Sequence, residues 1–214
     1  MTVPLVVIGA GGFGREALDV AEAINAASDA PLFDILGVID DAPDSENLRL
    51  LSNRGIRYLG TQESWPSAEP TAQFVVGIGS PLVRQRIAQK FGDLGRVPAT
   101  LIHPSANIGS EVVVSGGLVI CAGVAVSTNV SFGAHVHVNA NATIGHDTVL
   151  GDYVSVNPGA VISGNVVIEA RTLIGAGAVL LQGLRVGEES TVGAAACVVR
   201  NVEQGRTVKG IPAR

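Results

Sequence analysis

A six-residue repeat in the second half of the chain constrains the fold more than any other feature. From Ile102 onward, every sixth residue is apolar for seventeen consecutive positions. Four residues after each of these comes a second, smaller inward class, such as Leu118, Val136 and Val154. Two inward residues spaced two apart make one short strand step, so the remaining residues of each six must turn a corner. Neither an amphipathic helix nor a β-sandwich has a period of six, and the pattern predicts a hexapeptide coil with one thin, continuous core.

Composition agrees with a thin core and excludes several classes of partner. Aromatic residues make up 4% of the chain and there are 27 glycines, so Val, Ile, Leu and Ala must fill the interior. The net charge of −5 offers no electrostatic footprint for nucleic acid. The longest apolar run, about 116–126, is shorter than the roughly 20 residues of a membrane helix, and the N-terminus lacks the basic start of a signal peptide. With only Cys121 and Cys197 available, we expect a cytoplasmic protein that binds neither nucleic acid nor membrane.

The first hundred residues follow a different pattern, which predicts two domains, 1–100 and 101–214. Apolar runs at 5–8, 35–39 and 74–79 alternate with helical spacing at 15–26 and 81–91, and Ser80 stands where it can cap the last helix. Alternating strands and helices favour a parallel sheet covered by helices. The expected fold class is therefore an α/β Rossmann-like domain followed by an all-β hexapeptide coil.

A glycine turn joins the first strand to the first helix. Gly9-x-Gly11-x-x-Gly14 has the spacing of a dinucleotide fingerprint, in which glycines let backbone N–H groups approach a phosphate. A tight turn without a ligand is the alternative. In dinucleotide-binding folds an acidic residue about 20 positions further on binds the ribose, but Asp40 comes 31 residues after Gly9. A dinucleotide site also needs two mononucleotide-binding halves, and about 100 residues are hardly enough for both. The turn thus favours a nucleotide-sized or sugar-phosphate ligand over a redox dinucleotide.

Six segments in order give the chain a family resemblance. They are the glycine turn through Glu16, the strand end 38–41, the turn 77–80, the junction 101–106, the segment 139–147 and the ending 209–213. Together they resemble the sialic acid O-acetyltransferase and bacillosamine N-acetyltransferase family of sugar acetyltransferases. The resemblance implies a left-handed parallel β-helix of about five 18-residue coils, a homotrimer, and direct acetyl transfer from acetyl-CoA to a hydroxyl or amine of a sugar, often nucleotide-linked. Smooth, alanine-rich coil faces point to the same need for a partner copy.

The same resemblance implies where the sugar nucleotide binds. The expected pocket residues in the first domain are Gly11, Gly12, Phe13, Asp40, Asp41, Gly79 and Ser80. Some family members carry histidine where this chain has Phe13, so the polar contacts to substrate differ here.

Acyl transfer needs a base near neutral pH, and histidine suits that task. Of the four histidines, His103 is expected to pack at the domain junction, whereas His135 and His137 could lie at a subunit face. His146 is a corner residue followed by Asp147, and it matches the family's catalytic base, with Asp147 as the carboxylate that favours imidazolium. A solvated corner residue without a role is the alternative. Thr128 and Gly164, eighteen residues to either side, are small enough to leave room for a thioester.

Further positions are expected to contact acceptor or acetyl-CoA. Asn139 matches a family asparagine near the acceptor, or is only a turn stabiliser. Ser155 stands where the family often has a second histidine that contacts acetyl-CoA or the acceptor. Small residues of the later coils, Gly159, Ala176 and Ala194, would let the pantetheine arm lie against backbone, and Arg206, Lys209 and Arg214 could meet the CoA phosphates or form a charged tail.

Two other functions fit parts of the pattern. A zinc hydrase of the gamma carbonic anhydrase class would use His135, His137 and His146 as ligands, although that class lacks a Rossmann-like first domain. A rigid trimeric spacer with a degenerate pocket is the non-enzymatic alternative. No metal is expected for acetyl transfer, and the sequence leaves open which sugar is used and whether N or O is acetylated.

Overall fold

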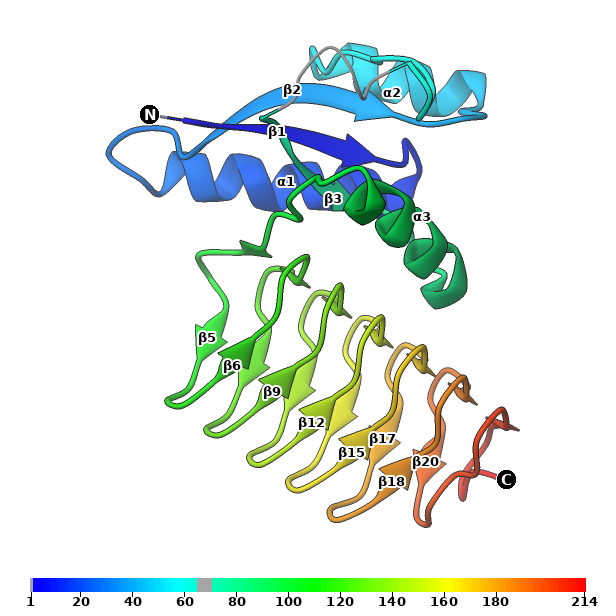
Figure 1. Ribbon diagram of the computed structural model, residues 1–214. Helices are drawn as coiled ribbons and strands as arrows, with labels where there is room; N and C mark the ends of the chain where they lie inside the picture. The colour runs from blue at the N-terminus through cyan, green and yellow to red at the C-terminus, as the bar shows by residue number, and fades with distance from the viewer. Residues whose placement is uncertain (1, 65–70) are drawn as a thin grey trace.

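The computed structural model describes residues 2–64 and 71–214, and it divides into an α/β part and a coil (Figure 1). The α/β part contains a parallel three-stranded sheet of order β2-β1-β3, built from β1 (Val3–Ile8), β2 (Phe33–Ile39) and β3 (Gln73–Val76). Three helices accompany it: α1 (Gly12–Ala26), α2 (Ser45–Asn53) and α3 (Pro81–Asp93). Within the described residues no helix is long and apolar enough to span a bilayer.

Local sequence explains most of these helix boundaries. Pro81 occupies the first turn of α3, where its missing N–H is not needed. Ser80 is the N-cap residue as expected, but its side chain makes no capping hydrogen bond. The short helix α2 was not predicted, and Asp44 caps it by accepting a 2.6 Å hydrogen bond from the Asn47 backbone N–H. Its first-turn Glu46 adds favourable charge at the helix N-terminus.

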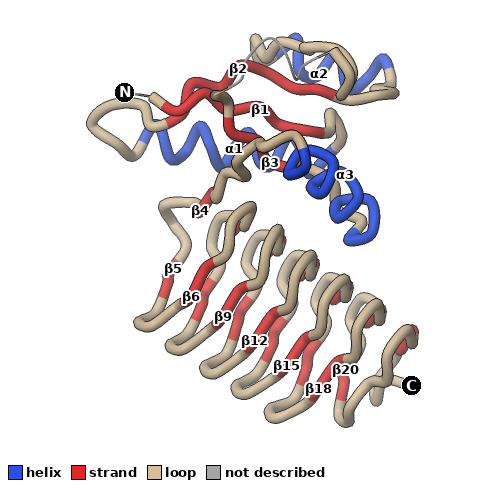
Figure 2. Tube along the Cα trace, viewed as in Figure 1, coloured by secondary structure: helices blue, strands red, loops and turns tan. Residues whose placement is uncertain are grey.

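The coil is a parallel β-helix with three sheets, confirming the expected fold class (Figure 2). The first sheet contains β4 (Leu101–Ile102), β7 (Val119–Ile120), β10 (His137–Val138), β13 (Ser155–Val156), β16 (Leu173–Ile174), β19 (Thr191–Val192) and β21 (Thr207–Val208). The second sheet contains β5 (Asn107–Ile108), β8 (Ala125–Val126), β11 (Thr143–Ile144), β14 (Val161–Ile162), β17 (Val179–Leu180) and β20 (Cys197–Val198). The third sheet contains β6 (Val113–Val114), β9 (Ser131–Phe132), β12 (Val149–Leu150), β15 (Val167–Ile168) and β18 (Arg185–Val186).

The register shows how the repeat builds the coil. Val138 pairs with Ile120 on one side and Val156 on the other, an offset of eighteen residues in each direction. The last pairing is shorter, because Thr191 pairs with Thr207, sixteen residues later. The strands run on past Val198, where the apolar repeat ends, to Val208, so the coil makes about 6 turns rather than the expected five.

Every corner from Glu111 to Ala195 uses a left-handed backbone conformation. Asn129, Asn141 and Asp147 all have φ of 59°, and glycine takes the equivalent place in other hexapeptides. Asn, Asp and Gly tolerate this region better than other residues. The corner chemistry therefore repeats with the same period as the core.

The α/β part covers one side of the coil and leaves the others open. The outward residues Val119, His137 and Ser155 of the first sheet are buried, and Val119 and Cys121 belong to the same apolar cluster as Leu5 and Leu18 of the α/β part. The corresponding outward residues of the second and third sheets, such as Thr143 and Val149, are exposed. The first sheet is therefore the interface between the two parts.

Candidate functional site

The turns that follow β1 and β3 lie side by side, and we call the space over their open glycines, Gly11, Gly12 and Gly79, the crevice. Gly9 to Gly14 follow β1, Gly77 to Ser80 follow β3, and the register pairs Ile8 with Val76. Because the chain leaves β1 toward β2 on one side and β3 lies on the other, this is a topological switch point, where ligands of open α/β sheets bind.

The glycines at this crevice have two separate roles. A Cβ on Gly14 would lie 1.8 Å from the Gly9 carbonyl oxygen, and a Cβ on Gly77 would lie 2.4 Å from the Gly14 Cα, so these glycines allow close packing of the two turns. A Cβ on Gly11, Gly12 or Gly79 would meet nothing within 4 Å. These three glycines and the exposed Ser80 border open space. That space lies at the start of α1, where the backbone N–H groups of the first turn favour an anion.

The two aspartates of the expected pocket are held by the loops around it. Asp40 accepts hydrogen bonds from the Ala10 N–H at 2.8 Å and the Ala42 N–H at 3.0 Å. Asp41 accepts from the backbone and side-chain nitrogens of Gln62 at 2.8 Å and 2.7 Å. Both carboxylates shape the rim of the crevice, and their direct contact with a ligand stays a prediction.

The side chain of Phe13, which was expected to line the pocket, packs against the coil. Its ring stacks on the His137 imidazole with centroids 4.2 Å apart, which joins α1 to the first sheet of the coil. The residue is half-buried, so its part in the predicted pocket is shared with the interface between the two parts.

The expectation that His135 and His137 lie at a subunit face is wrong. Both are buried beneath the α/β part, and His135 stacks parallel to Tyr153 with ring centroids 5.5 Å apart. Burial, with a smaller contribution from the Arg84 charge, lowers the pKa of His135 to about 4. The same two causes and His135 hold the pKa of His137 well below the usual value, against the opposing effect of the Val76 carbonyl. Both rings are therefore neutral near pH 7 and shielded from substrate.

His146 lies in the opposite kind of environment. It occupies the exposed corner between β11 and β12, and its Nδ1 lies 2.7 Å from Asp147 Oδ2. Asp147 Oδ1 accepts a 3.0 Å hydrogen bond from Asn129 Nδ2, one coil earlier. The hydrogen bonds from His146 and Asn129 lower the pKa of the Asp147 carboxyl. Since an ionised carboxylate only accepts, Nδ1 carries the proton and Nε2 of the neutral ring has a free lone pair.

The next coil makes room for the imidazole. A Cβ on Gly164 would lie 2.5 Å from both Cε1 and Nε2 of His146, so the ring rests directly over this glycine. Equivalent corner positions carry alanine at Ala122, Ala134 and Ala170, which shows that the backbone accepts a side chain there. Thr128, the other expected neighbour, donates its hydroxyl to the Ser110 carbonyl at 3.0 Å.

The structure contradicts two of the expected contacts to acetyl-CoA or acceptor. Ser155 is 2% exposed, and its hydroxyl accepts from Arg84 and donates to the Gly79 carbonyl, because the α/β part covers this strand. Asn139 is 8% exposed and its amide donates to the Val156 carbonyl at 2.9 Å, as the turn-stabiliser alternative predicts. Gly159, Ala176 and Ala194 are exposed corner residues, and their contact with the pantetheine arm stays a prediction.

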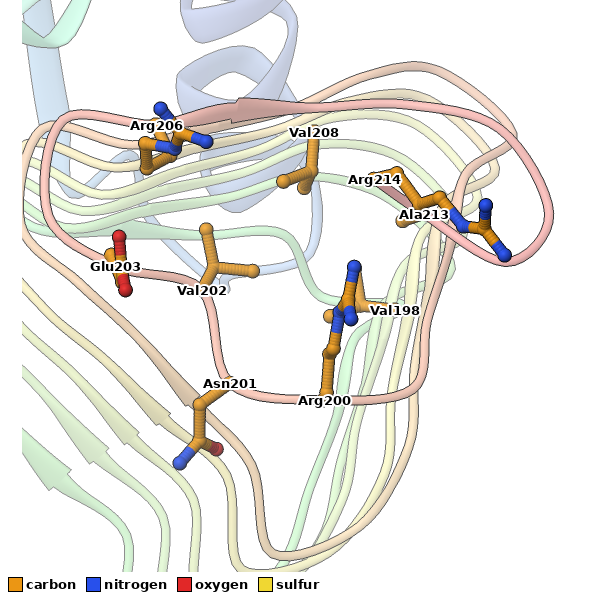
Figure 3. A pocket seen from close by; sticks show the side chains of 9 residues that line it. All are labelled: Val198, Arg200, Asn201, Val202, Glu203, Arg206, Val208, Ala213 and Arg214. Atoms are coloured by element: carbon orange, nitrogen blue, oxygen red, sulfur yellow. The ribbon is translucent and has the colours of Figure 1, made fainter.

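Cations gather at the C-terminal end of the coil around a cavity of about 390 Å³ (Figure 3). Its rim carries Arg200, Arg206 and Arg214, and its apolar lining includes Val202 and Val208. The exposed Lys209, expected to meet CoA phosphates, is not among the lining residues. Arg200 was missed because it stands six residues before the first of the terminal cations considered, Arg206.

The histidines do not fit the zinc alternative. His135 and His137 are buried under the α/β part, whereas the imidazole of His146 is exposed at another corner of the coil. In the parts of the chain that the structure describes, no three His, Cys, Asp or Glu side chains could hold a metal ion. The Cys121 thiol is no candidate nucleophile either, because burial raises its pKa to about 12.

Sequence reasoning missed two residues that organise this region. Asn129 could have been found, because it stands eighteen residues before Asp147 and the repeat predicts that such residues stack. Arg84 gave no such signal. It lies on α3 with its side chain fully buried against the coil.

Residues 4–91 match the PglD N-terminal domain family. The chain is 32% identical over 122 residues to UDP-N-acetylbacillosamine N-acetyltransferase from Bacillus subtilis (strain 168), a match that covers 55% of this chain and spans about half, 51%, of that protein.

Solved structures resemble the whole chain. The acetyltransferase domain of PglB from Neisseria gonorrhoeae FA1090 is 28% identical, with a TM-score of 0.86 over 99% of this chain and 98% of that one. A mutant of perosamine N-acetyltransferase from Caulobacter crescentus, solved with CoA and GDP-perosamine, is 26% identical, with a TM-score of 0.88 over 99% and 95% of the two chains. These matches confirm the resemblance seen in the sequence: residues 4–91 match the PglD N-terminal domain family, and the chain shares the fold of sugar N-acetyltransferases of known structure.

Proposed function

We propose that this protein transfers an acetyl group from acetyl-CoA to the amino group of a nucleotide-linked sugar. The observation that carries the proposal is the exposed His146: Asp147, itself held by Asn129, contacts Nδ1, and Nε2 on the other side of the ring lies beside Gly164. The relatives support the donor and the acceptor, because the PglB domain has been solved with acetyl coenzyme A and the Caulobacter enzyme with CoA and GDP-perosamine.

His146 would act as a general base. As the sugar amine attacks the thioester carbonyl, Nε2 takes the amine proton, a C–N bond forms, and collapse of the oxyanion breaks the C–S bond. The protonated imidazole, stabilised by Asp147, then returns the proton to the leaving CoA thiolate. A backbone N–H would stabilise the oxyanion. No covalent enzyme intermediate is required, and none of these steps needs a metal.

The geometry also supports the homotrimer. The crevice belongs to the part that covers the first sheet, whereas His146 lies between the second and third sheets of the same chain. A sugar nucleotide held in the crevice would therefore meet His146 of a neighbouring copy. The trimer would have a mass of about 65 kDa, three times 21.8 kDa. We include in this proposal a cytoplasmic location, with which the two free cysteines agree.

The test combines a substrate panel with the oligomeric state. Purified protein is mixed with acetyl-CoA and UDP-, GDP-, dTDP- or CMP-linked amino sugars, and product is identified by mass spectrometry as a gain of one acetyl group. The matching hydroxy sugars are the control for O-acetylation. The proposal is contradicted if none of the sugars is acetylated, or if light scattering shows a monomer at micromolar concentration.

A further inference from the structure

Arg84 is a fully buried cation that joins the two parts of the molecule. Its side chain is 0% exposed, and its five N–H groups reach six acceptors within hydrogen-bond distance. Nη1 donates to the carbonyls of Ile78 at 2.8 Å and Gly79 at 3.1 Å. The acceptors on the coil are the carbonyls of His135, Tyr153 and Val154 and the hydroxyl of Ser155.

All of these acceptors are neutral. A buried guanidinium is usually paired with a carboxylate, because removing a charge from water is costly. Among the described residues no carboxylate forms an ion pair with Arg84. Burial lowers the pKa of Arg84 to about 9, so the side chain still carries its charge at pH 7. Peptide dipoles surround the charge without cancelling it.

The contacts converge on one wall of the crevice. Ile78 and Gly79 belong to the open turn after β3, and the Gly79 carbonyl is held a second time by the Ser155 hydroxyl at 2.9 Å. His135 and Tyr153 are corner residues of successive coils, eighteen positions apart. The turn that lines the crevice is thereby fixed to two coils of the β-helix through a single side chain.

We propose that Arg84 is a positioning residue for the sugar nucleotide: it holds the turn Gly77–Ser80 against the coil and places an uncancelled positive charge behind the phosphate-binding side of the crevice. The inference rests on the proposed function, since it names the residue that shapes the same crevice. Inside a protein such a charge acts over a longer range than in water, because the surroundings screen it less.

The test separates positioning from stability. Arg84→Met removes the charge and the hydrogen bonds at similar volume, and Arg84→Lys keeps the charge. Ser155→Ala removes the hydrogen bond from Ser155 to the Gly79 carbonyl and one of the six acceptors of Arg84. The matched control is Arg171→Met, which breaks the contacts of Arg171 with Glu188 and Glu189 within the coil. For each variant, KM for the sugar nucleotide, KM for acetyl-CoA, kcat and amide hydrogen exchange of residues 77–80 are measured.

We expect Arg84→Met to raise KM for the sugar nucleotide by about tenfold or more while KM for acetyl-CoA changes little. Arg84→Lys should recover part of the loss, and Ser155→Ala should show a smaller rise in the same direction. Exchange of residues 77–80 should quicken in the Arg84 variants and not in Arg171→Met. If Arg84→Met does not fold, Arg84→Lys and Ser155→Ala give the same comparison.

Two results would overturn the inference alone. One is an unchanged KM for the sugar nucleotide in folded Arg84 variants. The other is a lower kcat with both KM values and the amide exchange of residues 77–80 unchanged, because a smaller folded fraction by itself lowers the apparent kcat only. A wild-type protein that acetylates no sugar nucleotide overturns the proposed function and this inference together.

Discussion

Two histidine-bearing regions of the same coil have opposite properties. His135 and His137 lie under the α/β part, stacked on aromatic rings, and their pKa values are lowered by burial and by Arg84. His146 lies on an uncovered corner with a carboxylate partner and an open face. All three belong to the same hexapeptide repeat, so the repeat does not decide which histidine can act as a base. The domain packed over the coil decides it, because that domain removes water from one side only.

The largest effect should come from the exposed histidine. His146→Ala removes the proposed base and should lower kcat by about 10² to 10⁴-fold, the usual contribution of general-base catalysis. Asp147→Asn should cost less, because the ring keeps its position and its lone pair. Steady-state kinetics measure both, with trimer mass and acetyl-CoA affinity expected to stay nearly constant. His103→Ala is the control, and near-normal turnover of His146→Ala would remove this residue from the mechanism.

Protonation of the buried pair, His135 and His137, should change the free energy of unfolding rather than kcat. The folded-state pKa of His135, about 4, lies below the ordinary value of 6.5, so the unfolded chain binds more protons between these values. Stability should therefore fall as pH decreases from 6.5 toward 4, by up to about 3 kcal/mol from this group, and should lose nothing more from it at lower pH.

His135→Asn is the matched variant for this pH dependence, because asparagine does not titrate and tolerates the positive φ of this corner. Denaturant unfolding at pH 7.5 and pH 5 measures the difference. The assignment is wrong if the variant loses as much stability between these pH values as the wild type. His137 adds to the same trend in both proteins, since its pKa is also lowered.

A methyl group added at Gly164 should show how far kcat depends on the position of the His146 ring, because the imidazole itself is unchanged. Gly164→Ala places a Cβ where Cε1 and Nε2 now lie, so the ring must move while the backbone, which carries alanine at other corners, stays folded. A misplacement of this kind should lower kcat by about 10- to 100-fold. Gln182→Ala, at the same corner one coil further, should leave kcat unchanged. Equal turnover of the Gly164 variant and the wild type would show that the ring tolerates displacement.

The smallest effect concerns the ring nitrogens of His137. Among residues 2–64 and 71–214, neither has a partner with hydrogen-bond geometry, although the residue is 1% exposed. His137→Phe keeps the stack on Phe13 and removes the buried polar atoms, so it should raise the free energy of unfolding by about 1 kcal/mol. Thermal or denaturant unfolding measures this, with kcat expected to stay the same. A loss of stability would indicate that an imidazole nitrogen contributes through the Val76 carbonyl.

The periodicity of the sequence predicted the coil more completely than it predicted the candidate site. Apolar residues from Ile102 to Val198 predicted which residues of each hexapeptide face inward. The family resemblance implied three hexapeptides per coil, and the eighteen-residue offset of the strand pairing confirms it. His146 and Asp147 were also identified, since the repeat places His146 at an outward corner and the family resemblance implies a base and its acidic neighbour at these positions. The sixteen-residue pairing of Thr191 with Thr207 and the helix α2 were missed, because neither follows the repeat.

What the sequence by itself determined is therefore local and periodic: two kinds of architecture, the glycine turn, and the outward corner with its acid. Only the tertiary structure decided that Ser155, His135 and His137 are buried and that Asn139 bonds the backbone. Their hexapeptide positions are equivalent to exposed ones, and the difference arises when the α/β part settles on one sheet of the coil. Arg84 shows the same limit, because its six acceptors come from segments up to 71 positions away in the chain.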